Sequence, residues 1–186
     1  MSRSSHLPPR ALILVGAAGL AFGVLYLVLV LGSDHTDDRG LTAALGLLVG
    51  WSFLGTGLFA WWRRPENRTG MLMTAAGFAW FATGVSAAND DVVFTIGITV
   101  DGLFPAVVGH LLMAFPTGRL ETRAQRVVIA GVYLAVTVLQ IPGLLFDDEP
   151  RNLLLVEPEQ GLSDALDGLQ FLVGLSLILV SAGILV

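Results

Sequence analysis

The sequence predicts an all-α, polytopic membrane protein, a bundle of six transmembrane helices in one domain. Composition is the first observation: of 186 residues, 54% are apolar and 13% charged, whereas a soluble domain carries about a quarter charged residues. Segregation of the charges into short islands is the second. Between these islands lie apolar runs longer than about 18 residues, which is the length of a transmembrane helix.

Each predicted span is an apolar run bounded by charges, prolines or glycines. The first is long enough to cross a bilayer, so we interpret it as an uncleaved helix rather than a signal peptide. The spans are expected at about residues 11–32, 41–62, 70–88, 92–115, 126–146 and 163–186. Residues 1–186 should therefore form a single integral membrane domain.

The arginines predict the orientation of the bundle. All ten basic residues are arginine, and eight lie in the N-terminal tail or in the loops after the second and fourth spans: Arg3, Arg10, Arg63, Arg64, Arg68, Arg119, Arg123 and Arg126. Only Arg39 and Arg151 lie in the other loops. Because short cytoplasmic loops are enriched in arginine, we expect both termini in the cytoplasm and the spans in the plasma (inner) membrane.

The loop after the second span contains its own helix stop. Pro65 lacks an N–H and restricts Arg64 to an extended conformation, so the helix must end before the proline. The paired tryptophans Trp61 and Trp62 suit a membrane–water boundary. Gly70 then allows the next helix to start close to the turn.

The loop after the fourth span is the second predicted cytoplasmic turn, ended by Pro116 and Gly118. After it, Arg119, Arg123 and Arg126 recur at helical spacing, which predicts one arginine face. Such a face suits anionic lipid head groups or a neighbouring soluble domain. A plain topology signal accounts for it equally well.

Four polar side chains are predicted to lie within the membrane. Asp101 falls about 13 Å inside the outer edge of its span, and Gln140, Asp167 and Gln170 fall about 6–10 Å inside theirs. Their shared depth predicts that they converge, with Pro105 and Pro142 opening the helices nearby. The cluster is compatible with a ligand pocket, a cation site or a proton switch. A water-filled vestibule, or helix–helix hydrogen bonding alone, explains it too.

The sequence gives little support for a metal site, a catalytic site or a nucleic-acid-binding site. His110 lies near the cytoplasmic end of the fourth span and has no histidine or cysteine companion, which favours a packing role over a metal site. No glycine-rich phosphate loop or other catalytic motif is present. No basic–aromatic platform for nucleic acid is present either.

Small residues and one outer loop indicate helix contacts. Gly19 and Gly23, like Gly46 and Gly50, are four residues apart, which lets helices approach closely. Packing within one bundle explains them more simply than a homodimer, although a homodimer stays possible. The outer segment Leu153–Val156 is expected at the lipid interface or folded over the mouth of the bundle, as an anchor or as a ligand lid.

Two stretches resemble the membrane region of actinobacterial sensor histidine kinases. Residues 62–70, Trp-Arg-Arg-Pro-Glu-Asn-Arg-Thr-Gly, resemble their first cytoplasmic loop. Residues 110–120, His-Leu-Leu-Met-Ala-Phe-Pro-Thr-Gly-Arg-Leu, are similar to their second. The residues that carry this resemblance are Arg63, Arg64, Pro65, Asn67, Gly70, His110, Pro116, Gly118 and Arg119.

The resemblance implies a signal-input domain that acts on a cytoplasmic kinase through the sixth span. ATP, Mg²⁺ and a response regulator would then belong to a kinase part beyond Val186, since this chain has neither of the kinase modules. Two alternatives remain open from the residues alone. One is a small transporter or channel that uses the outer polar cluster, and the other is a passive membrane anchor.

Overall fold

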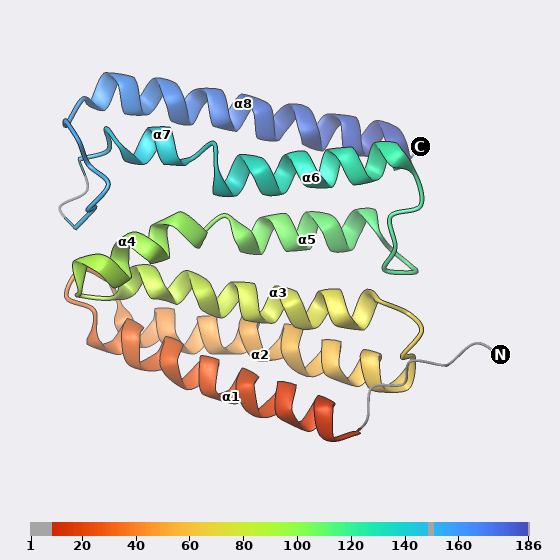
Figure 1. Cartoon of the computed structure of the whole chain (residues 1–186). Coiled ribbons are helices and arrows are strands. Elements are labelled where there is room, and N and C mark those ends of the chain that lie inside the picture. The colour runs from red at the N-terminus through yellow and green to blue at the C-terminus, as the bar shows by residue number, and fades with distance from the viewer. Residues whose placement is uncertain (1–8, 149–150, 186) are drawn as a thin grey trace.

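The computed structural model describes residues 9–148 and 151–185 (Figure 1). Within these ranges all regular elements are helical. They are α1 Pro9–Gly32, α2 Arg39–Arg63, α3 Thr69–Thr83, the 3₁₀ helix η1 Gly84–Ala87, α4 Asp91–Val100, α5 Leu103–Met113, α6 Arg123–Thr137, α7 Ile141–Leu144 and α8 Gln160–Leu185. The predicted all-α fold class is confirmed.

Among the residues that the structure describes, five helical segments are long and apolar enough to cross a membrane: Arg10–Gly32, Arg39–Arg63, Thr69–Ala87, Asp91–Met113 and Arg123–Leu144. They match the first five predicted spans to within a few residues. The third runs through α3 into η1, the fourth combines α4 with α5, and the fifth combines α6 with α7. The 26 residues of α8 extend about 39 Å, which exceeds a hydrocarbon core of about 30 Å. A count of six spans stays a prediction.

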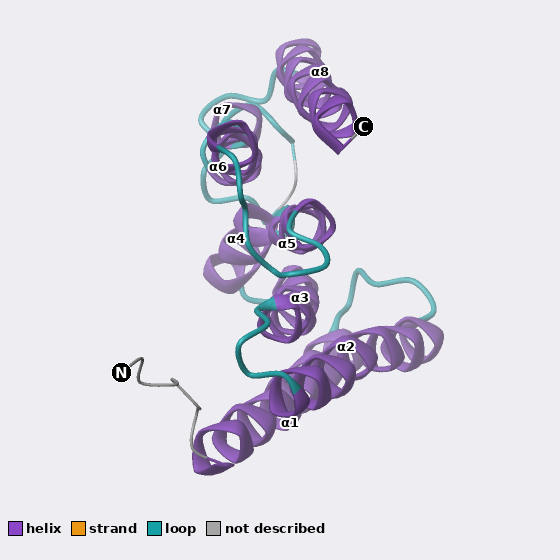
Figure 2. Ribbon diagram, turned by 90° about the vertical axis from the view of Figure 1, so that its right-hand side faces the viewer, coloured by secondary structure: helices purple, strands orange, loops and turns teal. Residues whose placement is uncertain are grey.

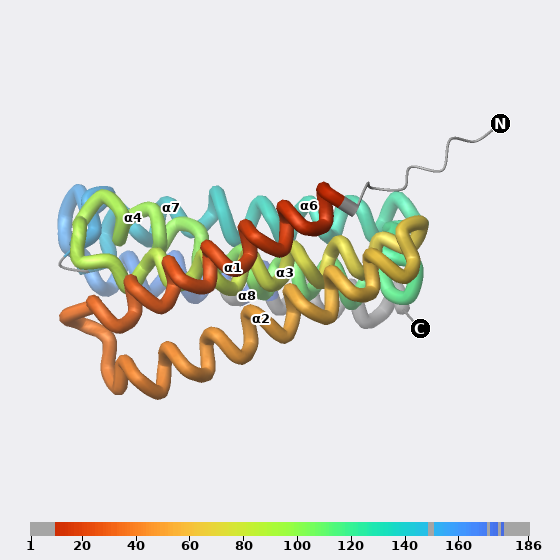
Figure 3. Tube along the Cα trace, turned by 90° about the horizontal axis from the view of Figure 1, so that it is seen from below, coloured from red at the N-terminus to blue at the C-terminus, as the bar shows by residue number. Residues whose placement is uncertain are grey.

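The helices stand side by side in chain order, as an elongated row (Figures 1 and 2). At one edge of the row α1 and α2 pack on each other and on α3, and at the other α8 packs on α6 and α7. Their axes run between the same two ends (Figure 3). We call the end with the α2–α3 and α5–α6 loops the arginine-rich end, and the opposite end the acidic end. α1 begins and α8 ends at the arginine-rich end (Figure 1).

Prolines divide two of the spans, as the sequence predicts. A proline at position i cannot donate to the carbonyl at i−4, and its ring clashes with that carbonyl. The carbonyl at i−4 belongs to Asp101 for Pro105, and the break between α4 and α5 lies at Asp101 and Gly102. For Pro142 the corresponding residue is Val138, which caps the end of α6. Both breaks lie in the acidic half of the bundle.

The predicted glycine contacts occur within one chain. A Cβ added at Gly19 would lie 2.9 Å from Leu54, and one at Gly23 would lie 2.5 Å from Trp51. Gly46 faces Tyr26 and Gly50 faces Phe81 in the same way. These glycines therefore serve packing between α1, α2 and α3, which confirms the simpler of the two interpretations. The homodimer stays a prediction.

Candidate functional site

An arginine at the acidic end ties together three loops that are far apart in the sequence. Arg151 Nη2 donates to both carboxylate oxygens of Asp34, at 2.9 and 2.7 Å. Its Nη1 donates to the backbone carbonyl of Asn89 and lies 3.7 Å from Asp91. The Asn89 side chain in turn donates to the Gly32 carbonyl at the end of α1. The loop after α7 is thereby fixed to the ends of α1 and α4.

His35 extends this network toward the interior. Its Nδ1 lies 3.0 Å from Asp34 Oδ1, and its Nε2 lies 3.1 Å from the backbone carbonyl of Ser86 in η1. The hydrogen bond from His35 lowers the pKa of Asp34, and the charge of Arg151 adds to the effect. Both contacts favour the charged form of Asp34.

His35 also lines a polar pocket of about 350 Å³. It is walled by α1, α2, η1 and the end of α4, and Asp101 supplies a carboxylate to it. Hydroxyl-bearing side chains supply the other polar groups: Tyr26, Thr36, Thr42, Thr83 and Ser86. One carboxylate among several hydroxyls suits a small polar or cationic ligand, or a proton.

The close approach of α4 to η1 places Asp101 at this pocket. A Cβ added at Gly97 would lie 2.2 Å from the Ser86 nitrogen, so only glycine lets α4 come this near to η1. Asp101 follows Gly97 by four residues, one helical turn further along the same face. The contact at Gly97 therefore sets the position of Asp101.

The three other residues of the predicted polar cluster lie elsewhere. Within the described part of the chain, Asp101 is the only one of the four that lines the pocket, and no hydrogen bond joins any two of them. Gln140 donates from Nε2 to the Ile98 carbonyl in the last turn of α4, at 3.1 Å. Asp167 of α8 packs on α7, with Oδ1 2.7 Å from the place of a Cβ at Gly143. Gln170 is half-buried one turn further along α8.

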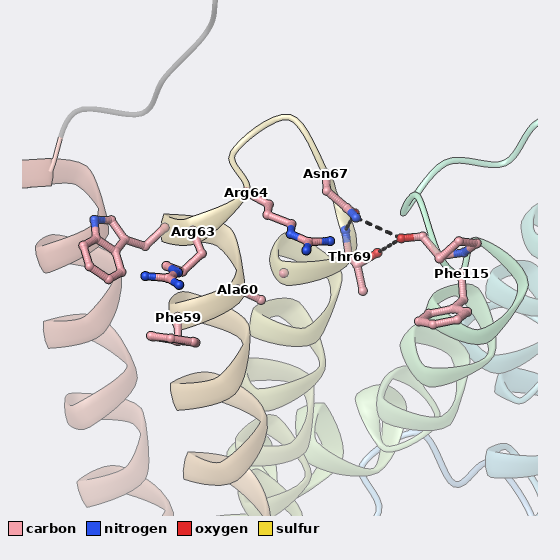
Figure 4. A pocket seen from close by; sticks show the side chains of 10 residues that line it. Phe59, Ala60, Arg63, Arg64, Asn67, Thr69 and Phe115 are labelled. Atoms are coloured by element: carbon pink, nitrogen blue, oxygen red, sulfur yellow. Dashed lines mark hydrogen bonds between the residues drawn. The ribbon is translucent and has the colours of Figure 1, made fainter.

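The two loops that carry the family resemblance are in direct contact at the arginine-rich end. The Pro116 carbonyl accepts from Asn67 Nδ2 at 2.9 Å and from Thr69 Oγ1 at 2.8 Å (Figure 4). The Arg68 backbone N–H donates to the Thr117 carbonyl at 3.1 Å. We call residues 64–70 and 115–119 the loop interface. Motifs nearly fifty residues apart thus form one structure.

Glycines and a proline shape the loop interface. Gly118 has φ +71°, and a Cβ there would lie 2.3 Å from the Arg68 carbonyl carbon. A Cβ at Gly70 would lie 2.4 Å from the Trp61 nitrogen, so α3 starts against α2. α2 ends at Arg63, two residues before Pro65. The helix stop and the close restart predicted from Pro65 and Gly70 are confirmed.

The predicted arginine face on one helix is wrong. The α6 helix begins only at Arg123, because Thr122 and Gln125 form a capping box that fixes its first turn. Arg119 lies before this cap and donates to the Glu66 carbonyl at 3.5 Å, across the loop interface. Arg126 donates to the Leu120 carbonyl at 3.2 Å.

His110 links two helices and lies away from the loop interface. Its Nδ1 lies 3.3 Å from the Tyr133 hydroxyl, so it connects α5 with α6. This contact fits the predicted packing role. Among the described residues, no group of three or more histidine, cysteine or carboxylate side chains lies close enough to hold a metal ion.

Neither His35 nor the role of Arg151 was predicted from the sequence. Arg151 is one of two arginines on an otherwise acidic side, and that isolation is a signal that it needs a carboxylate partner. The segment Leu153–Val156 is tied down beside it: Leu153 N–H donates to Thr95, and Val156 N–H donates to the Leu145 carbonyl. These bonds hold the segment against α4 and the end of α7, while Leu153 and Val156 stay exposed. Both predicted positions, at the lipid interface and over the mouth of the bundle, stay predictions.

No family model, no curated protein and no solved structure matches this chain. The class that its fold and composition define is an all-helical protein with several helices apolar enough to span a membrane.

Proposed function

We propose that this chain is the six-span input domain of a sensor kinase in the bacterial plasma membrane. The pocket at the acidic end receives a stimulus from outside the cell. The response passes to α8, and through α8 to a cytoplasmic kinase that uses ATP and Mg²⁺ and acts on a response regulator. Both termini and the arginine-rich end lie in the cytoplasm, as the arginine distribution favours.

One observation carries this proposal: a continuous line of contacts leads from the pocket to α8. Asp101 lies at the pocket and at the break that ends α4. Ile98, in the last turn of α4, accepts the hydrogen bond from Gln140, which lies at the break between α6 and α7. Three residues after Gln140, Gly143 of α7 packs directly on Asp167 of α8. Three of the four predicted polar residues therefore lie at successive steps of one path.

The two helix breaks give this path a physical means of movement. A break lacks part of the regular i to i−4 hydrogen bonding, so the short segments α4 and α7 are less constrained than a continuous helix. Gln140 satisfies a terminal carbonyl of α4, which couples the two segments. A stimulus shifts their arrangement only to the extent that it binds one arrangement more tightly.

The position of Asp101 favours a site over a purely structural role. A carboxylate facing lipid costs about 2.5–3.5 kcal/mol on insertion scales, and the pocket relieves that cost with hydroxyl groups and access to water. A ligand or proton that changes the charge at Asp101 alters the balance of forces at the end of α4. Proton uptake from outside is the simplest such stimulus.

A chimeric kinase tests the proposal. The chain is joined through α8 to the cytoplasmic part of a histidine kinase whose own sensor has been removed, and autophosphorylation is measured in proteoliposomes at several external pH values. We expect Asp101→Asn to hold the output at one level across this range. We expect Gln140→Leu to make the output independent of the residue at position 101.

The matched control is Asp37→Asn, which changes an exposed carboxylate at the same end but outside the pocket. It should leave the pH response of the chimera unchanged. The proposal fails if Asp101→Asn behaves like the control. It also fails if Gln140→Leu leaves the effect of Asp101→Asn intact, because the line of contacts would then carry no signal.

A further inference from the structure

An open pocket of about 1010 Å³ lies at the arginine-rich end, between the ends of α2, α3 and α5. Arg63 and Arg64 supply its positive charge, and Phe59, Trp62 and Phe115 supply apolar walls. It lies at the opposite end of the bundle from the pocket of Asp101 and takes no part in the proposed signal path.

The two arginines have no acidic partner among the described residues. All three ion pairs in that part of the chain lie at the acidic end. The Arg63 guanidinium lies over the Phe59 ring, 5.7 Å from its centre. Arg64 points toward Asn67 and Thr69 (Figure 4). Each guanidinium therefore keeps N–H donors for an anion, and its planar fork matches phosphate oxygens.

The apolar walls narrow the kind of anion that fits. Phe59, Trp62 and Phe115 are 59%, 60% and 68% exposed, although they stand at the ends of membrane-compatible helices. Tryptophan is typical of the boundary between hydrocarbon and head groups, and the exposed rings of Phe59 and Phe115 add apolar surface beside it. A free phosphate ion would use the arginines and leave these rings unused, whereas a lipid uses both.

We propose that this pocket binds the phosphodiester head group of an anionic membrane lipid. Arg64, which points toward Asn67 and Thr69, holds the phosphate (Figure 4). Arg63, which lies over Phe59 on the other side of the end of α2, adds positive charge to the pocket. Phe59, Trp62 and Phe115 contact the glycerol and the first methylene groups of the acyl chains. Two cations without acidic partners select an anionic lipid over a zwitterionic one, because a second positive charge on the head group would be repelled.

Lipid titration of the purified chain tests this site. Native mass spectrometry gives apparent dissociation constants for phosphatidylglycerol and phosphatidylcholine. We expect preference for phosphatidylglycerol, and about 25-fold weaker binding of it by Arg63→Gln/Arg64→Gln, since each arginine near an anionic surface contributes roughly fivefold. The control, Arg68→Gln/Arg123→Gln, removes two charges from the same end but outside the pocket, and should change binding less than about threefold.

A second variant separates a lipid from a soluble anion. Trp62→Gln keeps both arginines and should weaken lipid binding while the fold, followed by circular dichroism, is retained. Equal binding of the two lipids would overturn the proposal. So would equal weakening by the two double variants, which would indicate diffuse surface charge. Displacement of bound lipid by millimolar inorganic phosphate would show a soluble-anion site instead.

Discussion

Replacing Gly118 by alanine should separate the two halves of the loop interface. Gly118 adopts φ +71°, a left-handed conformation that costs an alanine about 1–2 kcal/mol. A Cβ would also lie 2.3 Å from the Arg68 carbonyl carbon, closer than atoms can approach. Since that neighbour is backbone, it cannot rotate away, and the α5–α6 loop must move off the α2–α3 loop.

The size of the effect follows from the contacts that this movement breaks. Besides the bond from Arg119 to Glu66, three hydrogen bonds cross the loop interface: from Asn67 and Thr69 to the Pro116 carbonyl, and from Arg68 N–H to the Thr117 carbonyl. A hydrogen bond contributes about 0.5–1.5 kcal/mol net. Loss of two of them, added to the backbone strain, lowers the free energy of unfolding by about 2–5 kcal/mol.

Denaturant unfolding in detergent, followed by tryptophan fluorescence, measures this change. Gly109→Ala is the control, because Gly109 lies within α5 and a Cβ there meets nothing within 4 Å. That substitution should be neutral or stabilise by up to about 1 kcal/mol, as alanine favours helix. A Gly118→Ala protein within about 0.5 kcal/mol of the wild type would refute the loop interface, because it would exclude even the lower estimate of strain.

Two further predictions concern the acidic end. Gly97→Ala should lower the unfolding midpoint in the same assay, by the equivalent of about 1–3 kcal/mol, because its Cβ would overlap the Ser86 backbone. Asp147→Asn should stabilise the chain at pH 7 by less than about 1 kcal/mol, because burial and then the charge of Asp167 raise the pKa of Asp147. The raised pKa means that charged Asp147 destabilises the folded state, so the stabilisation by Asp147→Asn should disappear as the pH falls toward the ordinary aspartate pKa. Stabilisation that does not change with pH would contradict this prediction.

Local sequence signals predicted the helices because each depends on few residues. Pro65 ends α2 from within the chain, through its missing N–H and the restriction on Arg64. Pro105 and Pro142 likewise locate the breaks four residues before them. The capping box of Thr122 and Gln125 is an equally local signal. It begins α6 at Arg123 and so excludes Arg119 from the predicted arginine face.

The partners of the polar residues were not predictable in the same way. Counting residues along a helix gives depth, and Asp101, Gln140 and Asp167 do share the acidic half of the bundle. Depth does not give the direction in which a side chain points. For Asp101 that direction is set by the approach of Gly97 to η1, a contact between two elements that no local pattern in either one reveals.

The loop interface changes what the family resemblance can support. Asn67, Thr69, Pro116 and Gly118 each have a structural reason to be where they are, because two of them donate, one accepts and one permits the turn. Packing of two loops accounts for this set without reference to a kinase. The resemblance therefore predicts how the arginine-rich end is built, whereas the proposed signalling role rests on the separate path from Asp101 through Gln140 to Asp167. An experiment on the loop interface therefore does not test the signalling path, and an experiment on the path does not test the loop interface.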